Sequence, residues 1–144
     1  MASKVYGSLL AKALNKEIDF DSDTIKVALL SSAYSPNQDT HDYYDDVVAN
    51  EVTGTGYTAG GATLASKTLT YDAANNVTIL DAADVTWASS TITARYAVIY
   101  DDSGATNSQK ALIGYVDFGS DQSSTSGNFT ITWDATGILR GTVA

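Results

Sequence analysis

The glycine-rich segment EVTGTGYTAGG, residues 51–61, has residue types and spacing that could hold a phosphate. Gly54, Gly56 and Ala59 fit the pattern G-x-G-x-x-(G/A), whose backbone amides bind a dinucleotide pyrophosphate at a helix N-terminus. That chemistry needs a hydrophobic strand before the glycines and a helix after them. An acidic stretch precedes them here and ATLASKTLTY, a strand pattern, follows, so the sequence favours a tight glycine turn.

Three aspartates at alternate positions, Asp19, Asp21 and Asp23, could bind a hard cation such as Ca²⁺. Their D-x-D-x-D spacing opens an EF-hand loop, which also needs Gly at its sixth position and Glu at its twelfth. The chain has Thr24 and Leu30 there, so the EF-hand is excluded. An acidic turn between a helix and a strand is the favoured interpretation, and a looser calcium site is the alternative.

The sequence contains few residues that could serve hydrolytic catalysis or bind a cofactor. His41 is the only histidine and there is no cysteine, which excludes thiolate chemistry and multi-histidine metal sites. Because no G-x-S-x-G or H-E-x-x-H motif is present, we expect His41 to serve a loop or a helix cap. Trp87 and Trp133 could stack on sugars, but their inward alternation on strands favours core packing. We therefore expect no catalytic residue and no cofactor.

Composition indicates one folded domain over all 144 residues, with 44% hydrophobic residues. The net charge is -9 and the eight Lys and Arg residues are scattered, so nucleic acid and anionic membranes are disfavoured as partners. Lys12 and Lys16 interrupt any apolar signal core, and no later apolar run approaches a membrane span. We expect synthesis in the cytoplasm without a signal peptide.

The first sixteen residues have the pattern of an amphipathic helix. A second, short helix is predicted over residues 42–49, with Asp39 or Thr40 as its cap and acidic residues in its first turn. The apolar stripe of the first helix consists of Val5, Leu9, Ala13 and Leu14, with Lys4, Lys12 and Lys16 off the stripe.

Most of the remaining chain alternates with a period of two, as half-buried strands do. In residues 91–100 this alternation puts the even-numbered side chains, from Ile92 to Tyr100, on one face. The polar segment 120–128 is predicted to be a hairpin tip. Loops rich in Asp, Ser, Gly and Asn favour an antiparallel β-sandwich or a jelly-roll-like barrel with a short N-terminal helix. The predicted strands are residues 24–31, 62–71, 76–81, 85–88, 91–100, 110–118 and 128–134.

Four motifs in order, EVTGTGYTAGGATL, ARYAVIYDD, ALIGYVDFG and FTITWDATGIL, carry a resemblance that covers nearly the whole chain. With these motifs the chain resembles a widespread family of small structural proteins of tailed bacteriophages and prophages. The shared motifs are structural rather than catalytic. The resemblance implies a virion protein.

Small size and acidic charge favour a place on the capsid surface, as a non-enzymatic head decoration or cement protein. Its partner would be the major capsid protein, and we expect a homo-oligomer, with a trimer favoured. The alternative is a tail, baseplate or head-fibre component that binds a partner protein or a host glycan, and a glycan hydrolase is a third. Solvent-facing aromatic side chains along a groove would favour glycan binding, and buried tryptophans would favour the cement function.

Contact residues are expected in two places, the N-terminal helix (residues 1–16) and the aromatic-rich region 34–61. The opposing interpretation is that the helix only covers one open end of the sandwich. The candidate contact residues are Val5, Leu9, Tyr34, Tyr43, Tyr44 and Tyr57.

Overall fold

Two antiparallel sheets make up most of the structure, a computed structural model that describes residues 2–143. Strands account for 47% of the chain and helices for 11%, which confirms the mainly-β, sandwich-like prediction, and no closed barrel forms within residues 2–143. One sheet, which we call the lower sheet, has the order β1-β7-β6-β2-β3. The other, which we call the small sheet, has the order β4-β5-β8. The elements are β1 (Ala2–Val5), α1 (Leu9–Leu14), β2 (Ile25–Leu30), the 3₁₀ turns η1 (Tyr44–Asp46) and η2 (Val48–Asn50), β3 (Ala62–Thr63), β4 (Thr68–Asp72), β5 (Val77–Asp81), β6 (Val85–Asp101), the 3₁₀ turn η3 (Asn107–Gln109), β7 (Leu112–Ile131) and β8 (Leu139–Thr142).

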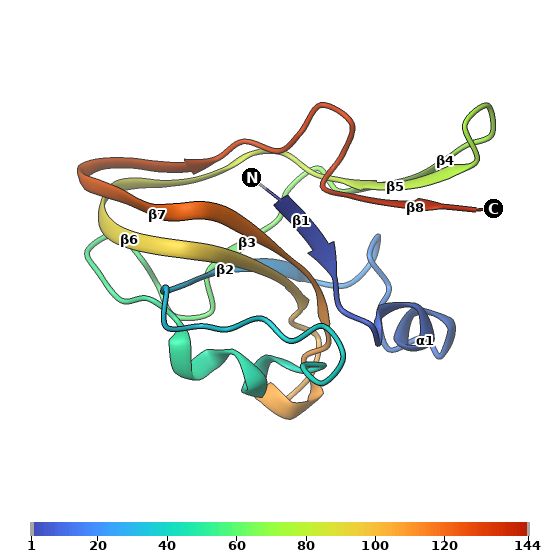
Figure 1. Ribbon diagram of the computed structural model, residues 1–144, viewed down its shortest axis with the longest axis horizontal. Helices are drawn as coiled ribbons and strands as arrows, with labels where there is room; N and C mark the ends of the chain where they lie inside the picture. The colour runs from blue at the N-terminus through green and yellow to red at the C-terminus, as the bar shows by residue number, and fades with distance from the viewer. Residues whose placement is uncertain (1, 144) are drawn as a thin grey trace.

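The long strands β6 and β7 pair from one layer of the sandwich into the other. Their antiparallel register runs from Val85 opposite Ile131 to Tyr100 opposite Leu112. In Figure 1 the β6–β7 ribbon bends at the left, so that the end of β7 lies in the upper layer with β5 and β8. Its beginning lies in the lower layer with β1 and β2. A single pair of strands therefore connects the two layers.

The predicted hairpin tip at residues 120–128 is wrong, because this segment is part of β7 and pairs with β6. Its polar side chains bond across the ladder: the Thr93 and Ser123 hydroxyls lie 2.8 Å apart, and those of Ser90 and Ser124 lie 2.7 Å apart. Cross-strand hydroxyl pairs of this kind stabilise a sheet without apolar side chains. The segment lacked the hydrophobic alternation by which strands are detected.

A bulge at Arg95 changes which face of β6 is apolar. Ala94 pairs with Gln122 and Tyr96 pairs with Asp117, so residues 118–121 stand opposite Arg95 alone. A bulge inverts the alternation of the side chains that follow it. Ile92 and Ala94 accordingly face the core between the layers, whereas Tyr96, Val98 and Tyr100 face the other side of the lower sheet. The prediction that all five share one face is wrong.

An ion pair holds the bulge in place. Arg95 Nε donates to Asp117 Oδ1 at 2.7 Å and Arg95 Nη2 donates to Asp117 Oδ2 at 3.3 Å. Asp117 Oδ1 also accepts the Gly119 amide at 2.8 Å, and Gly119 has a φ of +83°. These hydrogen bonds, that of Arg95 first, lower the pKa of Asp117. The motifs ARYAVIYDD and ALIGYVDFG thus meet at the bulge.

A second apolar cluster covers the opposite face of the lower sheet. Residues from 34 to 48 lie beneath this sheet in Figure 1 and bury Tyr34, Tyr44 and Val47 against Val98 and Tyr100. The lower sheet is consequently buried on both faces. This explains why β2 is buried or half-buried at every position, with no exposed alternate residues.

The N-terminal helix is shorter than predicted, and its stripe is inverted. Residues Ala2–Val5 form strand β1, which pairs with β7, and only Leu9–Leu14 are helical. Lys12, expected outside, is 6% exposed, whereas Leu14, expected inside, is 76% exposed. The Lys12 ammonium donates to the Asp42 carbonyl, lies 3.6 Å from the Asp42 carboxylate and sits 3.3 Å from the Tyr43 ring centroid. Burial lowers the pKa of Lys12, and these contacts offset the free-energy cost of burying its charge.

The predicted helix at residues 42–49 is replaced by the turns η1 and η2. Asp46 Oδ2 accepts the backbone amides of Asp42 at 2.9 Å and of Tyr43 at 3.4 Å. The acidic residues therefore do cap a helical turn, but Tyr43, rather than Asp39 or Thr40, holds the capping position.

The glycine-rich segment 51–61 is a tight turn pressed against two strands, as the sequence predicted. A Cβ at Gly54 would lie 2.2 Å from the Thr91 carbonyl oxygen, and one at Gly61 would lie 1.9 Å from the Val27 carbonyl oxygen. Glu51 Oε1 closes the turn by accepting the Tyr57 hydroxyl at 2.7 Å and the Gly60 amide at 2.6 Å. Strand β3 follows the glycines directly, so no helix N-terminus faces them.

We expect Gly61→Ala to lower the free energy of unfolding by at least about 3 kcal/mol, because the new methyl group meets the β2 backbone. Gly119→Ala is the matched control, since Gly119 also has positive φ but no neighbouring atom of residues 2–143 lies within 4 Å of the position that a Cβ would take. It should cost only about 1 kcal/mol, the steric cost of a left-handed conformation. Denaturation in urea measures both values, and equal losses would contradict the close-approach argument.

Candidate functional site

Two of the six predicted contact residues are buried in the second cluster. Tyr34 and Tyr44 are each 3% exposed, and Tyr44 stacks on Tyr100 with ring centroids 4.2 Å apart. The Tyr34 hydroxyl lies 2.8 Å from the Tyr6 hydroxyl and 2.9 Å from His41 Nδ1. Burial raises the pKa of Tyr34 to about 12. These tyrosines support the fold and are not part of the outer surface.

His41 has a structural place in the same network. Its Nδ1 accepts the Asn37 amide at 3.3 Å and lies 2.9 Å from the Tyr34 hydroxyl oxygen. The Tyr34 hydroxyl also bonds to the Tyr6 hydroxyl at 2.8 Å. The imidazole thereby ties the loop after β2 to the buried tyrosines.

Tyr43 and Tyr57 are half-buried, and their hydroxyls are used within the chain. Tyr43 donates to Glu17 Oε2 at 2.9 Å while its ring lies under the Lys12 ammonium. Tyr57 accepts the Leu29 amide at 3.0 Å, and its ring centroid lies 5.9 Å from that of Trp87. The aromatic-rich region 34–61 therefore joins elements of one molecule.

The exposed apolar side chains lie elsewhere, on β1, α1, β4 and the residue after β8. In Figure 1 α1, β4 and the end of β8 lie at the right, where the small sheet extends beyond the lower sheet. We call this group the apolar end. Its members, with their exposed fractions, are Val5 (38%), Leu10 (70%), Leu14 (76%), Leu69 (44%), Tyr71 (56%) and Val143 (57%).

Cross-strand register explains the exposure on β4. Leu69 pairs with Leu80, and Leu80 pairs with Leu139, so the three leucines share one face of the small sheet. Leu139 is 6% exposed in the main core, whereas Leu69 and Tyr71, on the same face, are uncovered. The small sheet thus projects past the core that its inner face would cover.

Sequence reasoning identified Val5 but not the other large contributors to the apolar end. Leu9, the remaining predicted contact residue, is half-buried against the main core. Leu10 and Leu14 are four residues apart, on the helical face opposite Lys12. Their exposure could have been predicted only if Lys12 had been assigned to the buried face of the helix. Leu69 and Tyr71 alternate like a core-facing strand, so their pattern gave no sign of exposure.

Unpaired cations accompany the apolar side chains. Within residues 2–143 the ion pairs are Lys12–Asp42, Lys26–Asp102, Lys110–Asp102 and Arg95–Asp117, and the Lys67 ammonium is bound by the Phe20 and Asp23 carbonyls. Lys4, Lys16 and Arg140 have no ion pair in this part of the chain. Lys4 belongs to β1, Lys16 follows α1 by two residues and Arg140 belongs to β8, so positive charge accompanies the elements of the apolar end in an acidic protein.

Asp19, Asp21 and Asp23, the calcium candidates, do not form a cluster of metal ligands. Asp19 Oδ1 accepts the Ser22 amide at 3.1 Å, and Asp23 Oδ2 accepts the Asp19 amide at 3.0 Å. Across residues 2–143 there is no group of three or more His, Cys, Asp or Glu side chains placed to hold a metal ion. The Asp19 and Asp23 carboxylates instead cap their own turn, in agreement with the favoured interpretation.

Two adjacent aspartates at the end of β6 have opposite electrostatic environments. Asp101 is 1% exposed and its Oδ1 accepts the Ser103 amide at 2.9 Å, while Oδ2 has no hydrogen-bond partner among the described residues. Burial raises the pKa of Asp101 to about 6, against the hydrogen bonds from Ser103 and with a contribution from Asp23.

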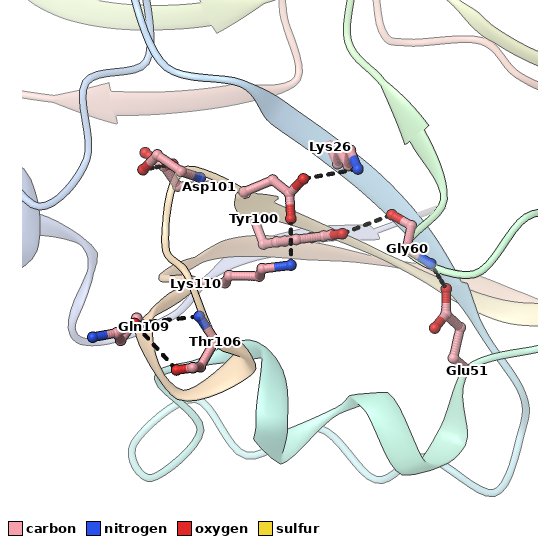
Figure 2. Close-up of polar contacts among 10 residues, drawn as sticks. Lys26, Glu51, Gly60, Tyr100, Asp101, Thr106, Gln109 and Lys110 are labelled. Carbon is pink, nitrogen blue, oxygen red and sulfur yellow. Dashed lines mark hydrogen bonds and ion pairs between the residues drawn. The ribbon is translucent and has the colours of Figure 1, made fainter.

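Asp102 instead receives the ammonium groups of Lys26 at 2.7 Å and Lys110 at 2.8 Å. Figure 2 shows both contacts beside the hydrogen bond from Tyr100 to Gly60. Burial alone would raise the pKa of Asp102, but the two ammonium groups outweigh it and lower this pKa.

A hollow of about 400 Å³ runs along the later part of β7. Neither tryptophan lines it: Trp87 is 6% exposed and Trp133 is 7% exposed, which confirms the prediction of core packing. Trp133 Nε1 donates to the Ala83 carbonyl at 3.0 Å. The lining residues are Phe118, Gln122, Ser123, Asn128, Phe129, Thr130, Ile131 and Thr132.

Comparisons with protein-family models, with curated proteins and with solved structures found no match for this chain. Within residues 2–143 no helix has the length and apolar character needed to cross a membrane.

We expect Asp101→Asn to stabilise the protein at pH 7.5 by about 1–3 kcal/mol, because the substitution removes a buried charge. A carboxyl group whose pKa is raised in the folded state binds its proton more tightly there. Its contribution to stability is therefore complete below about pH 4 and is lost as the pH rises through about 6. In urea denaturation from pH 4 to 7.5, the free energy of unfolding of Asp101→Asn should exceed that of the native chain at pH 7.5, and this difference should vanish at pH 4.

The matched control is Asp102→Asn, which removes both ion pairs and should destabilise the protein at pH 7.5. A loss of stability in Asp101→Asn equal to that of the control would contradict the assignment of a costly charge at Asp101.

Proposed function

We propose that this chain is a non-enzymatic structural protein of a tailed-phage virion, which binds the capsid surface as a decoration or cement protein. The observation that carries the proposal is the apolar end, where the large exposed hydrophobic side chains of residues 2–143 lie on β1, α1, β4 and the C-terminal residues. Large exposed apolar side chains with charged residues near them are typical of protein-binding sites. The four motifs of the phage structural family support the assignment to a virion.

The contact with the capsid is assigned to the β1–α1 side of the apolar end. Leu10 and Leu14 project from α1 on the face opposite Lys12, which is anchored to Asp42 and Tyr43. Covering each leucine would contribute about 1.5–3 kcal/mol. Lys4 of β1 and Lys16, two residues after α1, have no ion pair among the described residues, so the complementary surface of the major capsid protein would carry carboxylates.

Internal stability suits this role. A cement protein must keep its shape at many equivalent lattice positions, and this chain packs apolar residues on both faces of its lower sheet. The Lys12 anchor fixes α1 to the segment that covers the second cluster. Little ordering entropy would then be lost when the helix binds.

A tail, baseplate or head-fibre component is the alternative, and its glycan-binding form has less support. The β7 hollow has hydroxyl groups on its lining, but Thr130 bonds to Thr86 at 2.9 Å and Ser123 bonds to Thr93. The tryptophans that would stack on a sugar are in the core. A protein partner at the apolar end therefore accounts for more of the surface than a sugar in the hollow.

The test is binding of the purified protein to expanded capsids of the phage or prophage that encodes it. We expect stoichiometric binding by the native chain and at least a tenfold weaker affinity for Leu10→Asp/Leu14→Asp, because two apolar contacts are replaced by charges. Co-sedimentation measures the affinity. Thr125→Asp, at an exposed position of β7, is the control and should bind like the native chain.

These substitutions are sharper than removal of residues 1–16. Truncation would also delete β1 and uncover the β7 edge with which it pairs. Equal binding by both variants, or protein found on tails alone in a virion map, would contradict the capsid proposal.

A further inference from the structure

The β4 strand is the free edge of the small sheet. The two sheets end at β1 and β3 and at β4 and β8, respectively. Strand β3 has only two residues, and β1 and β8 lie next to each other, where Val5 and Leu139 line a common hollow. Within residues 2–143 no strand pairs with the outer side of β4, which has five residues. Its outward backbone groups are therefore available to another chain.

The sequence of β4, TLTYD, lacks the residues that usually protect such an edge. It contains no lysine, arginine, proline or glycine. Its single charge, Asp72, is engaged in the following turn, where its carboxylate accepts the amides of Ala74 at 3.0 Å and Asn75 at 3.3 Å. Leu69 and Tyr71 are 44% and 56% exposed on the inner face of the strand.

This five-residue pattern is complementary to itself. If two β4 strands run antiparallel about a two-fold axis at Thr70, Leu69 of each copy lies opposite Tyr71 of the other. Thr68 then lies opposite Asp72, so no two like charges face each other. Pairs of an aromatic and an aliphatic side chain across strands are favourable, and a threonine hydroxyl can donate to a carboxylate. We infer that β4 pairs with β4 of a second copy of this chain, which joins two small sheets into one of six strands.

Pairing would also cover the surface that the projecting sheet leaves open. Leu69 and Tyr71 continue the face that Leu139 buries in the main core, and the second copy supplies the missing neighbours for that face. Stable interfaces bury roughly 1,200–2,000 Å² in total, and a pair of five-residue strands buries less. The dimer is therefore weak, with a Kd of about 10–100 μM, and strengthens where copies are held close together.

A two-fold pairing closes at two copies, in place of the trimer that the sequence favoured. The inference does not rest on the capsid function, because it concerns the purified chain alone. Capsid binding uses Leu10 and Leu14 of α1, whereas the dimer uses Leu69 and Tyr71 of β4. A failed test of capsid binding therefore does not contradict the dimer, and a failed test of the dimer does not contradict capsid binding.

Cysteine cross-linking tests the two-fold axis directly, because the chain has no cysteine of its own. Thr70→Cys places one thiol at the axis, where directly opposite Cβ atoms are about 4.5–5.5 Å apart. A short bis-maleimide should convert this variant into a covalent dimer at protein concentrations near the Kd. Leu14→Cys is the control: Leu14 is 76% exposed but lies on α1, and its variant should stay monomeric. Equal cross-linking of the two variants would overturn the inference.

Charge variants test the register. Leu69→Lys/Tyr71→Lys and Leu69→Glu/Tyr71→Glu should each sediment as monomers, since like charges would face each other across the axis. An equimolar mixture should form a heterodimer, because each lysine then faces a glutamate. Circular dichroism confirms that both variants are folded. A native chain that sediments as a monomer at about ten times the expected Kd, or as a trimer, would overturn the inference, as would a mixture that remains monomeric.

Discussion

The pairing of β6 with β7 is the constraint on which the rest of the structure depends. These two strands run through both layers, so the layers are fixed relative to each other by backbone hydrogen bonds as well as by the core between them. The bulge at Arg95 makes this possible, because it inverts the alternation and lets one strand face two different cores. The Arg95–Asp117 pair and the Gly119 amide hold the extra residues of β7 at that point.

The second apolar cluster exists because of the bulge at Arg95. Because the bulge turns Tyr96, Val98 and Tyr100 away from the main core, the outer face of the lower sheet becomes apolar and must be covered. The segment with η1 and η2 covers it through Tyr34, Tyr44 and Val47, and the buried hydroxyls of Tyr6 and Tyr34 bond to each other. Lys12 then anchors α1 to this cover through Asp42 and Tyr43. The hydroxyls and rings of the tyrosines in this region are thus used within the molecule.

With that region used internally, the surface available for partners is set by where the layers stop overlapping. The small sheet projects beyond the lower one, and its inner face carries apolar residues beyond the part that the core covers. On α1 the helical face opposite the Lys12 anchor carries Leu10 and Leu14. Both surfaces arise from the geometry of packing rather than from a motif. They serve the two proposed contacts, one with a capsid and one with a second copy.

By itself the sequence determined the fold class, the positions of most strands, the glycine turn and the burial of both tryptophans. These features depend on local properties: two-residue alternation, turn residues and positive φ at glycine. Tertiary structure alone decided the rest. The strand at 120–128 is held by hydroxyl pairs with β6, the face of Tyr96 is reversed by a bulge, and Lys12 is buried by partners about thirty residues away along the chain. Of the six predicted contact residues, only Val5, at 38%, is among the exposed large apolar side chains, because a tyrosine or a leucine has the same local pattern whether a core or a partner covers it.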